Sequence, residues 1–81
     1  MNPAKVYVDV SARFRRDGRI LPVAVRWEDG RIYRIDKITD IRKAASFKAG
    51  GVGLRYTVRI GRTETYLFLE KDRWFVERRF L

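Results

Sequence analysis

Between residues 54 and 79, arginine and aromatic side chains alternate with apolar ones, so they share one face of the strands predicted there. The members of this face are Arg55, Arg59, Arg79, Tyr66, Phe68 and Phe75. Aromatic rings can stack on unpaired bases while arginine neutralises the neighbouring phosphates. The pattern predicts a surface that contacts single-stranded nucleic acid.

Two structural interpretations compete with base stacking on this face. In the first, Phe68 and Phe75 form a cross-strand pair beneath Arg55, which makes a cation–π contact with them. In the second, the face is buried under the 36–53 segment or under a second subunit. The same face also carries negative charge, from Glu64, Glu70 and Glu77.

No residue set in the sequence predicts catalysis. The chain has no histidine and no cysteine, which excludes thiolate chemistry, disulfides and metal sites built from those ligands. Its carboxylates fall in predicted turns or opposite arginines, as Asp9 does with Arg26, rather than converging in a cleft. Asp36 and Asp40 could bind a hard cation, but their spacing alone is not specific. We expect a non-enzymatic protein without a cofactor or metal.

Two further features have structural explanations. The segment Gly50-Gly51-Val52-Gly53 is flanked by Lys48 and Arg55. It matches neither the P-loop pattern nor the dinucleotide-binding fingerprint. We therefore expect a connector whose glycines adopt positive φ. Trp27 and Trp74 lie on predicted apolar faces and are expected to anchor the core.

Length and charge define the class of protein and of partner. The 81 residues suffice for one domain, spanning 1–81. Lys and Arg number 19 against 10 Asp and Glu, a net charge of +9. Such a charge favours nucleic acid, anionic lipid or an acidic protein as partner, and arginine in particular suits phosphate. The alternative is that the arginine-rich composition reflects a heat-adapted host or a GC-rich genome.

The start of the sequence shows no targeting signal. Residues 1–5 lead directly into strand-like sequence without a long apolar segment, so we expect no signal peptide and a cytoplasmic protein. No apolar run approaches the length of a membrane span.

Turn residues fix the strand registers of the first half. Asp17-Gly18 predicts a two-residue hairpin turn between strands near 5–16 and 19–27. The resulting register places Val10 opposite Val25, Asp9 opposite Arg26 and Phe14 opposite Leu21. Pro22 has no N–H to donate to a ladder. The second strand therefore lies at a sheet edge or carries a bulge at Pro22. Glu28-Asp29-Gly30 predicts a three-residue loop with Gly30 left-handed, and a third strand beginning near Arg31.

The second half predicts another meander, with strands near 54–60, 63–70 and 73–79. Turns at Gly61-Arg62 and Lys71-Asp72 place Tyr56 opposite Leu67 and Phe68 opposite Phe75. The intervening residues 36–53 favour a bent strand and a loop. A short helix within 38–48, begun by Thr39 and ended by Gly50, is the alternative.

Two three-stranded units, each with one apolar face, should pack on each other. We therefore expect an all-β fold: a six-stranded antiparallel small barrel or a strongly bent sheet built from two three-stranded meanders.

Three stretches resemble a known family: Trp27-Glu28-Asp29-Gly30-Arg31-Ile32-Tyr33, Arg55-Tyr56-Thr57-Val58 and Asp72-Arg73-Trp74-Phe75-Val76. They are similar to a family of small uncharacterised bacterial β domains with a Trp…Tyr-x-Val/Ile…Tyr-x-Val…Arg-Trp pattern, some of them attached to translesion DNA polymerases. The resemblance spans about residues 20–78. It implies a small bacterial β domain in a nucleic-acid setting and provides no catalytic residues.

The leading hypothesis is a non-enzymatic module that binds nucleic acid through this basic aromatic face. Arg55 and Arg59 would contact phosphate while Tyr66 and Phe68 stack on bases. The alternative is a protein-interaction or homodimerisation module, in which the same face forms an interface rimmed by arginine.

Overall fold

The computed structural model describes residues 5–45 and 52–81, and within them the chain forms seven strands and no helix. The strands are β1 (Lys5–Phe14), β2 (Ile20–Arg26), β3 (Ile32–Arg34), β4 (Lys37–Ala45), β5 (Val52–Ile60), β6 (Thr63–Glu70) and β7 (Arg73–Glu77). They form one antiparallel sheet in the order β3-β2-β1-β7-β6-β5-β4. The all-β prediction is confirmed, with seven strands instead of six.

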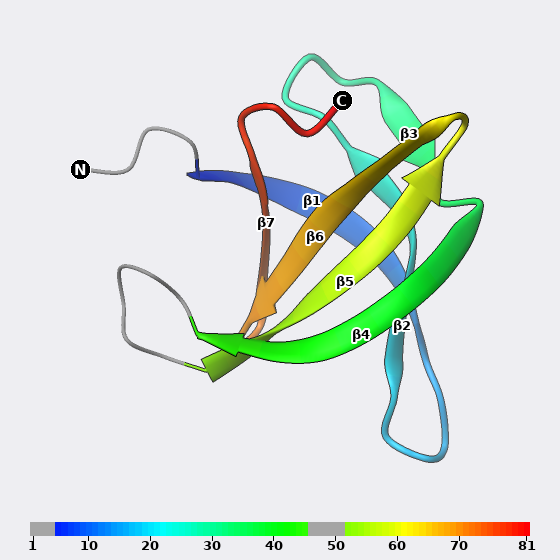
Figure 1. The fold of residues 1–81 in the computed structure, drawn as a ribbon, viewed down its shortest axis with the longest axis vertical. Coiled ribbons are helices and arrows are strands. Elements are labelled where there is room, and N and C mark those ends of the chain that lie inside the picture. Colours follow the sequence, from blue (N-terminus) through cyan, green and yellow to red (C-terminus); the bar gives the residue numbers. More distant parts are fainter. Residues whose placement is uncertain (1–4, 46–51) are drawn as a thin grey trace.

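The sheet curls into a half-barrel (Figure 1). Strands β3 and β4 lie at opposite ends of the strand order, yet only Ile35 and Asp36 connect them. The Ile35 N–H donates to the carbonyl of Val23 in β2 (2.9 Å), and the Asp36 N–H donates to the carbonyl of Arg59 in β5 (2.8 Å). Because adjacent residues bond to strands from both halves, the two ends of the sheet must approach each other.

The additional strand is β4, which pairs with β5 over its whole length. For residues 38–45 the helix alternative is therefore wrong, while residues 46–48 lie outside the described part. The spacing of Ile38 and Ile41 is typical of a helix, but a bulge explains it. Ile38 pairs with Val58 and Ile41 with Tyr56, because the ladder shifts by one residue at Thr39. Both isoleucines thus face the same side of a strand.

The first hairpin differs from its prediction at the turn and again at a bulge. The backbone hydrogen bond from the Arg15 N–H to the Arg19 carbonyl closes a three-residue loop rather than a two-residue one. Farther along, the ladder shifts between Ser11 and Ala12 because β2 contributes one extra residue beside Pro22. The two offsets cancel. The predicted pairs Val10–Val25 and Asp9–Arg26 are therefore confirmed, whereas Phe14 lies opposite Ile20 instead of Leu21.

The turn glycines have the predicted conformation, and the registers of the second half agree with the sequence. Gly18, Gly30 and Gly61 all have positive φ, at 91°, 90° and 61°. The predicted partners across β5, β6 and β7 are also present: Tyr56 pairs with Leu67, and Phe68 with Phe75. Strand β7 ends at Glu77, two residues before the predicted end.

Gly53 has a different role from the one expected for its glycine-rich segment. It lies in β5, and its φ is not among the positive ones. A Cβ atom at Gly53 would be 2.5 Å from the carbonyl oxygen of Leu69 on β6. The glycine therefore permits close approach of two backbones. Gly50 and Gly51 lie outside the described residues.

The concave side of the sheet holds the core. Its buried members are Val6, Val25, Tyr56, Val58, Leu67, Leu69, Val76 and Phe80. Trp27 and Trp74 pack against this cluster as expected, and Val10, on the same face, is partly buried. The Phe80 ring stacks on Trp27 (centroids 5.9 Å apart), so the end of the chain covers the β2–β3 turn.

Candidate nucleic-acid interface

Four aromatic rings line up on the face of the sheet opposite the core. They alternate along their strands with buried residues, and they cross three adjacent strands in the order Tyr66 and Phe68 on β6, Phe75 on β7 and Tyr7 on β1. Successive ring centroids are 6.3, 4.8 and 6.0 Å apart. We call this row the aromatic stripe.

The two central rings stack on each other. Phe68 and Phe75 stack face to face, with an interplanar angle of 4°, which is the cross-strand pair expected from their register. Both are half-buried. Much of the π surface of the two central rings is therefore already covered by their contact with each other.

The two end rings are more accessible. Tyr66 exposes 42% of its surface and Tyr7 exposes 44%. Each meets its phenylalanine neighbour edge to face, so it does not share a stacked face with that neighbour. The ends of the stripe are where a further planar group can be added.

Cations lie over the stripe along its length. The Arg55 guanidinium is 4.6 Å from the Tyr66 centroid, and the Arg73 guanidinium is 3.6 Å from the Tyr7 centroid. Lys5 Nζ lies 4.4 Å from the Phe75 centroid. The expected cation–π contact of Arg55 is thus present, but with Tyr66 instead of the phenylalanine pair.

Lys5 differs from the two arginines because an acid already neutralises it. Its Nζ is 3.3 Å from Glu70 Oε1, and both side chains are about 15% exposed. Burial alone would lower the pKa of Lys5, but hydrogen bonding to Tyr7 and Glu70 and the charge of Glu70 raise the pKa overall. Lys5 therefore stays charged and serves the internal ion pair.

Four of the six residues predicted for the site come together: Arg55, Tyr66, Phe68 and Phe75. Arg59 is exposed at the far end of β5, where it pairs with Glu64 across the ladder. Arg79 follows the end of β7, beyond the strand ladder, and lies between two residues that contact the β2–β3 turn. Strand β4 extends the sheet beside β5, so residues 37–45 do not cover the stripe.

Sequence reasoning missed Tyr7, Lys5 and Arg73. Alternation along β1 and β7 is visible in the sequence and would place all three on the outer face. Their membership also requires β1 to lie beside β7, where Tyr7 pairs with Phe75. No turn connects these two strands, so no turn residue could reveal the pairing.

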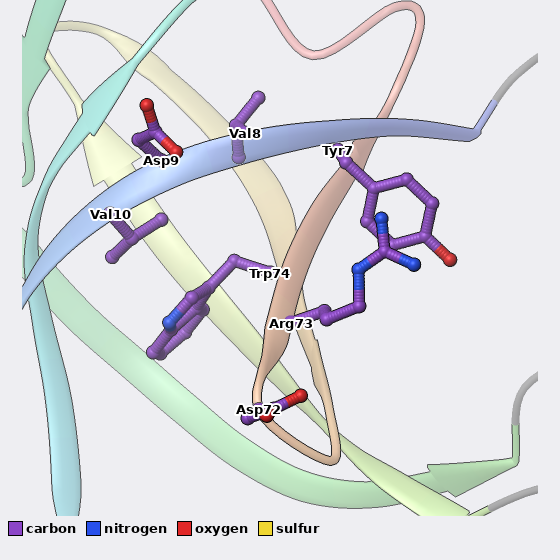
Figure 2. A pocket seen from close by; sticks show the side chains of 7 residues that line it. All are labelled: Tyr7, Val8, Asp9, Val10, Asp72, Arg73 and Trp74. Atoms are coloured by element: carbon purple, nitrogen blue, oxygen red, sulfur yellow. The ribbon is translucent and has the colours of Figure 1, made fainter.

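A hollow of about 460 Å³ opens at the Tyr7 end of the stripe, where β1 separates from β7 (Figure 2). The last pair between the two strands is Val8 with Trp74. The Arg73 side chain lies against the Tyr7 ring at one side of the hollow, and Asp72 lies in the β6–β7 turn below. With Asp9 as a second carboxylate in its lining, the hollow is less suited to phosphate than the outer face is.

The described residues contain no cluster of three or more carboxylate side chains able to hold a metal ion. Within residues 5–45 and 52–81, no helix has the length and apolarity needed to cross a membrane. Comparisons with protein-family models, curated proteins and solved structures find no match.

Proposed function

We propose that this protein is a non-enzymatic module that binds single-stranded nucleic acid through the aromatic stripe and the arginines beside it. The observation that supports this most strongly is the pairing at each end of the stripe. An exposed tyrosine ring lies there beneath a guanidinium group, Tyr66 with Arg55 and Tyr7 with Arg73. Stacking surfaces beside phosphate-binding cations are what a single strand requires.

The bases would stack at the ends of the stripe. Tyr66 and Tyr7 have the exposed surface for this, while the Phe68–Phe75 pair lies between them and contacts each ring edge to face. A strand crossing β6, β7 and β1 would meet two stacking positions, which suits a short footprint of a few nucleotides.

The phosphates would contact Arg55, Arg59 and Arg73. No ion pair connects these three to an acidic residue within the described part of the chain. The buried Nε of Arg55 also has no hydrogen-bond partner there. A buried donor without an acceptor is uncommon and calls for an explanation, and a phosphate oxygen reached by a small side-chain movement would satisfy it.

The resemblance to a family of small bacterial β domains, some of them attached to translesion DNA polymerases, adds to the proposal. It suggests a bacterial setting in which single-stranded DNA is exposed during synthesis. The chain's net charge of +9 is consistent with such a polyanion partner.

The experiment is a fluorescence-anisotropy titration of a labelled 12-nucleotide single strand. The Phe68→Leu variant keeps apolar volume while removing the ring, and Tyr66→Leu removes a stacking surface directly. We expect Tyr66→Leu to weaken binding by about 5- to 150-fold, which corresponds to roughly 1–3 kcal/mol per stacked base, and Phe68→Leu, which removes a ring that contacts Tyr66, to weaken it less. Ile32→Ala, which alters an exposed apolar residue on β3, is the matched control and should bind like the wild type.

Salt dependence separates phosphate contact from stacking. Arg55→Ala and Arg73→Ala should each reduce the slope of log affinity against log salt by about one unit, and Tyr66→Leu should leave the slope unchanged. Arg62→Ala removes the same charge from the β5–β6 turn and should change little. If Arg62→Ala matches Arg55→Ala, binding reflects net charge alone.

The dimerisation alternative predicts a different outcome. In that case the wild type would sediment as a dimer without nucleic acid, and Phe68→Leu or Tyr66→Leu would shift it to monomers. A dimer that these variants dissociate, together with no binding of single strands at low salt, would replace our proposal with the interaction module.

A further inference from the structure

The turn end of the β1–β2 hairpin concentrates the positive charge of the chain. Residues 13–19 hold four arginines, Arg13, Arg15, Arg16 and Arg19, against one acid, Asp17. This net charge of +3 is a third of the total in seven residues of 81. Every residue in the segment is exposed. We call residues 13–19 the hairpin tip.

The hairpin tip has a defined conformation. The Arg15 N–H donates to the carbonyl of Arg19 (2.9 Å), and the Gly18 N–H donates to the carbonyl of Arg15 (3.0 Å). Asp17 Oδ1 accepts from the Arg19 N–H at 3.0 Å. The three-residue loop is therefore closed by its own backbone, with Gly18 at φ 91°.

The base of the hairpin is fixed to the core. The Tyr56 hydroxyl donates to the carbonyl of Ile20 at 2.5 Å, and Pro22 is fully buried. Beyond this point the hairpin continues past β4, and its turn projects from the body of the protein (Figure 1). A two-stranded ribbon that is rigid at its base and basic at its end is thus presented to solvent.

The hairpin tip also exposes Phe14, at 77% the most exposed of the large apolar side chains in the described residues. A single exposed apolar residue is not unusual. Phe14, however, is flanked in the chain by Arg13 and Arg15. Only Arg15 among the tip arginines has an ion pair in the described part, with Asp17 at 3.6 Å.

We propose that the hairpin tip binds the groove of a nucleic-acid duplex. The major groove, about 12 Å wide, admits a two-stranded β-ribbon. In that position, arginines on both strands of the ribbon would face the two phosphate backbones. Phe14 would then pack against thymine methyl groups, which are the apolar groups that the major groove exposes.

A duplex contact at the hairpin tip would add to single-strand binding at the aromatic stripe. A preference for a junction between single strand and duplex rests on that proposed function. Tyr7 and Phe14 are seven residues apart on β1, a separation of up to about 23 Å at 3.3 Å per residue. A protein holding single strand at Tyr7 and duplex at Phe14 would favour a junction between the two. We therefore expect a duplex with a single-stranded overhang to bind more tightly than either part alone.

The test measures anisotropy with a blunt 18-base-pair duplex at two salt concentrations. We expect the double variant Arg16→Ala/Arg19→Ala to reduce the salt slope by about two units. Phe14→Ala should weaken duplex binding at least fivefold with an unchanged slope. Arg62→Ala and Ile32→Ala are the matched controls for charge and for exposed apolar surface, and both should stay within twofold of the wild type.

Three results would overturn the duplex contact. These are no binding of the wild type to duplex at low salt, an equal effect per removed charge of Arg62→Ala and Arg16→Ala/Arg19→Ala, or no effect of Phe14→Ala. The same variants measured on a single strand separate the two proposals. If Phe14→Ala is neutral on duplex while Tyr66→Leu weakens single-strand binding, the tip proposal fails alone. If Tyr66→Leu is neutral on single strand while Phe14→Ala weakens duplex binding, only the stripe proposal fails.

Discussion

The hydrogen bond from Tyr56 to Ile20 connects the two meanders, and Tyr56→Phe tests what it contributes. Tyr56 is 1% exposed, and its hydroxyl donates to the Ile20 carbonyl at 2.5 Å across 36 residues of sequence. The variant keeps the ring and its packing on Trp74 but leaves a partly buried carbonyl without its donor. The expected loss is about 1–3 kcal/mol, which lowers Tm by roughly 4–8 °C per kcal/mol in a domain of this size.

The pH dependence of the same variant gives an independent check. Burial raises the pKa of Tyr56 above its ordinary value. The stabilisation from the neutral phenol is therefore fully present below about pH 10, the ordinary value for tyrosine, and is lost as pH rises through the folded-state pKa. The stability difference between wild type and Tyr56→Phe should be constant below that pH and narrow above it. Lys5, whose pKa is also raised, is present in both proteins and cancels.

The assay is urea denaturation followed by tryptophan fluorescence between pH 6 and 11. Tyr33→Phe is the control, because no hydrogen bond of the Tyr33 hydroxyl is found in the described residues. It should change stability by less than about 0.5 kcal/mol. A Tyr56→Phe loss as small as that of the control, or a difference that widens above pH 10, would refute the reasoning.

Three further substitutions test the packing, each by urea denaturation. Leu67→Ala removes a fully buried side chain and should lower the free energy of unfolding by about 2–5 kcal/mol. A loss below about 0.5 kcal/mol would place Leu67 outside the core. Gly53→Ala places a methyl group 2.5 Å from the Leu69 carbonyl oxygen and should cost about 1–3 kcal/mol through overpacking, so unchanged stability would mean that β5 and β6 are farther apart. Gly30→Ala meets no atom within 4 Å but must adopt φ near 90°, so we expect a loss of about 1–2 kcal/mol from backbone strain alone; a stabilising effect would contradict the turn geometry.

Local registers were predictable because a turn fixes which side chains meet. Gly61-Arg62 and Lys71-Asp72 were enough to pair Tyr56 with Leu67 and Phe68 with Phe75. In the first hairpin a bulge beside Pro22 follows the turn. The predicted strand pairs there are correct only on the side of the bulge away from the turn. Proline indicates that a ladder is interrupted, but the side on which the extra residue appears depends on the packing around it.

The order of the strands was not predictable in the same way. Strand β4 had the spacing of a short helix, because the bulge at Thr39 brings Ile38 and Ile41 to one face. The pairing of β1 with β7 depends on how the whole sheet curls. Sequence therefore revealed three of the four rings of the aromatic stripe together with Arg55, while Tyr7 and Arg73 required the structure.

The most direct test of the central proposal is an NMR titration of the ¹⁵N-labelled protein with a short single-stranded oligonucleotide. The proposal predicts that the largest amide shifts fall on the strands of the aromatic stripe, around Tyr66, Phe75 and Tyr7, with Arg55 and Arg73 among them. Shifts should saturate with the oligonucleotide and diminish as salt is added. An oligonucleotide that leaves these amides unmoved at low salt, or that moves only residues elsewhere on the surface, would contradict the proposal.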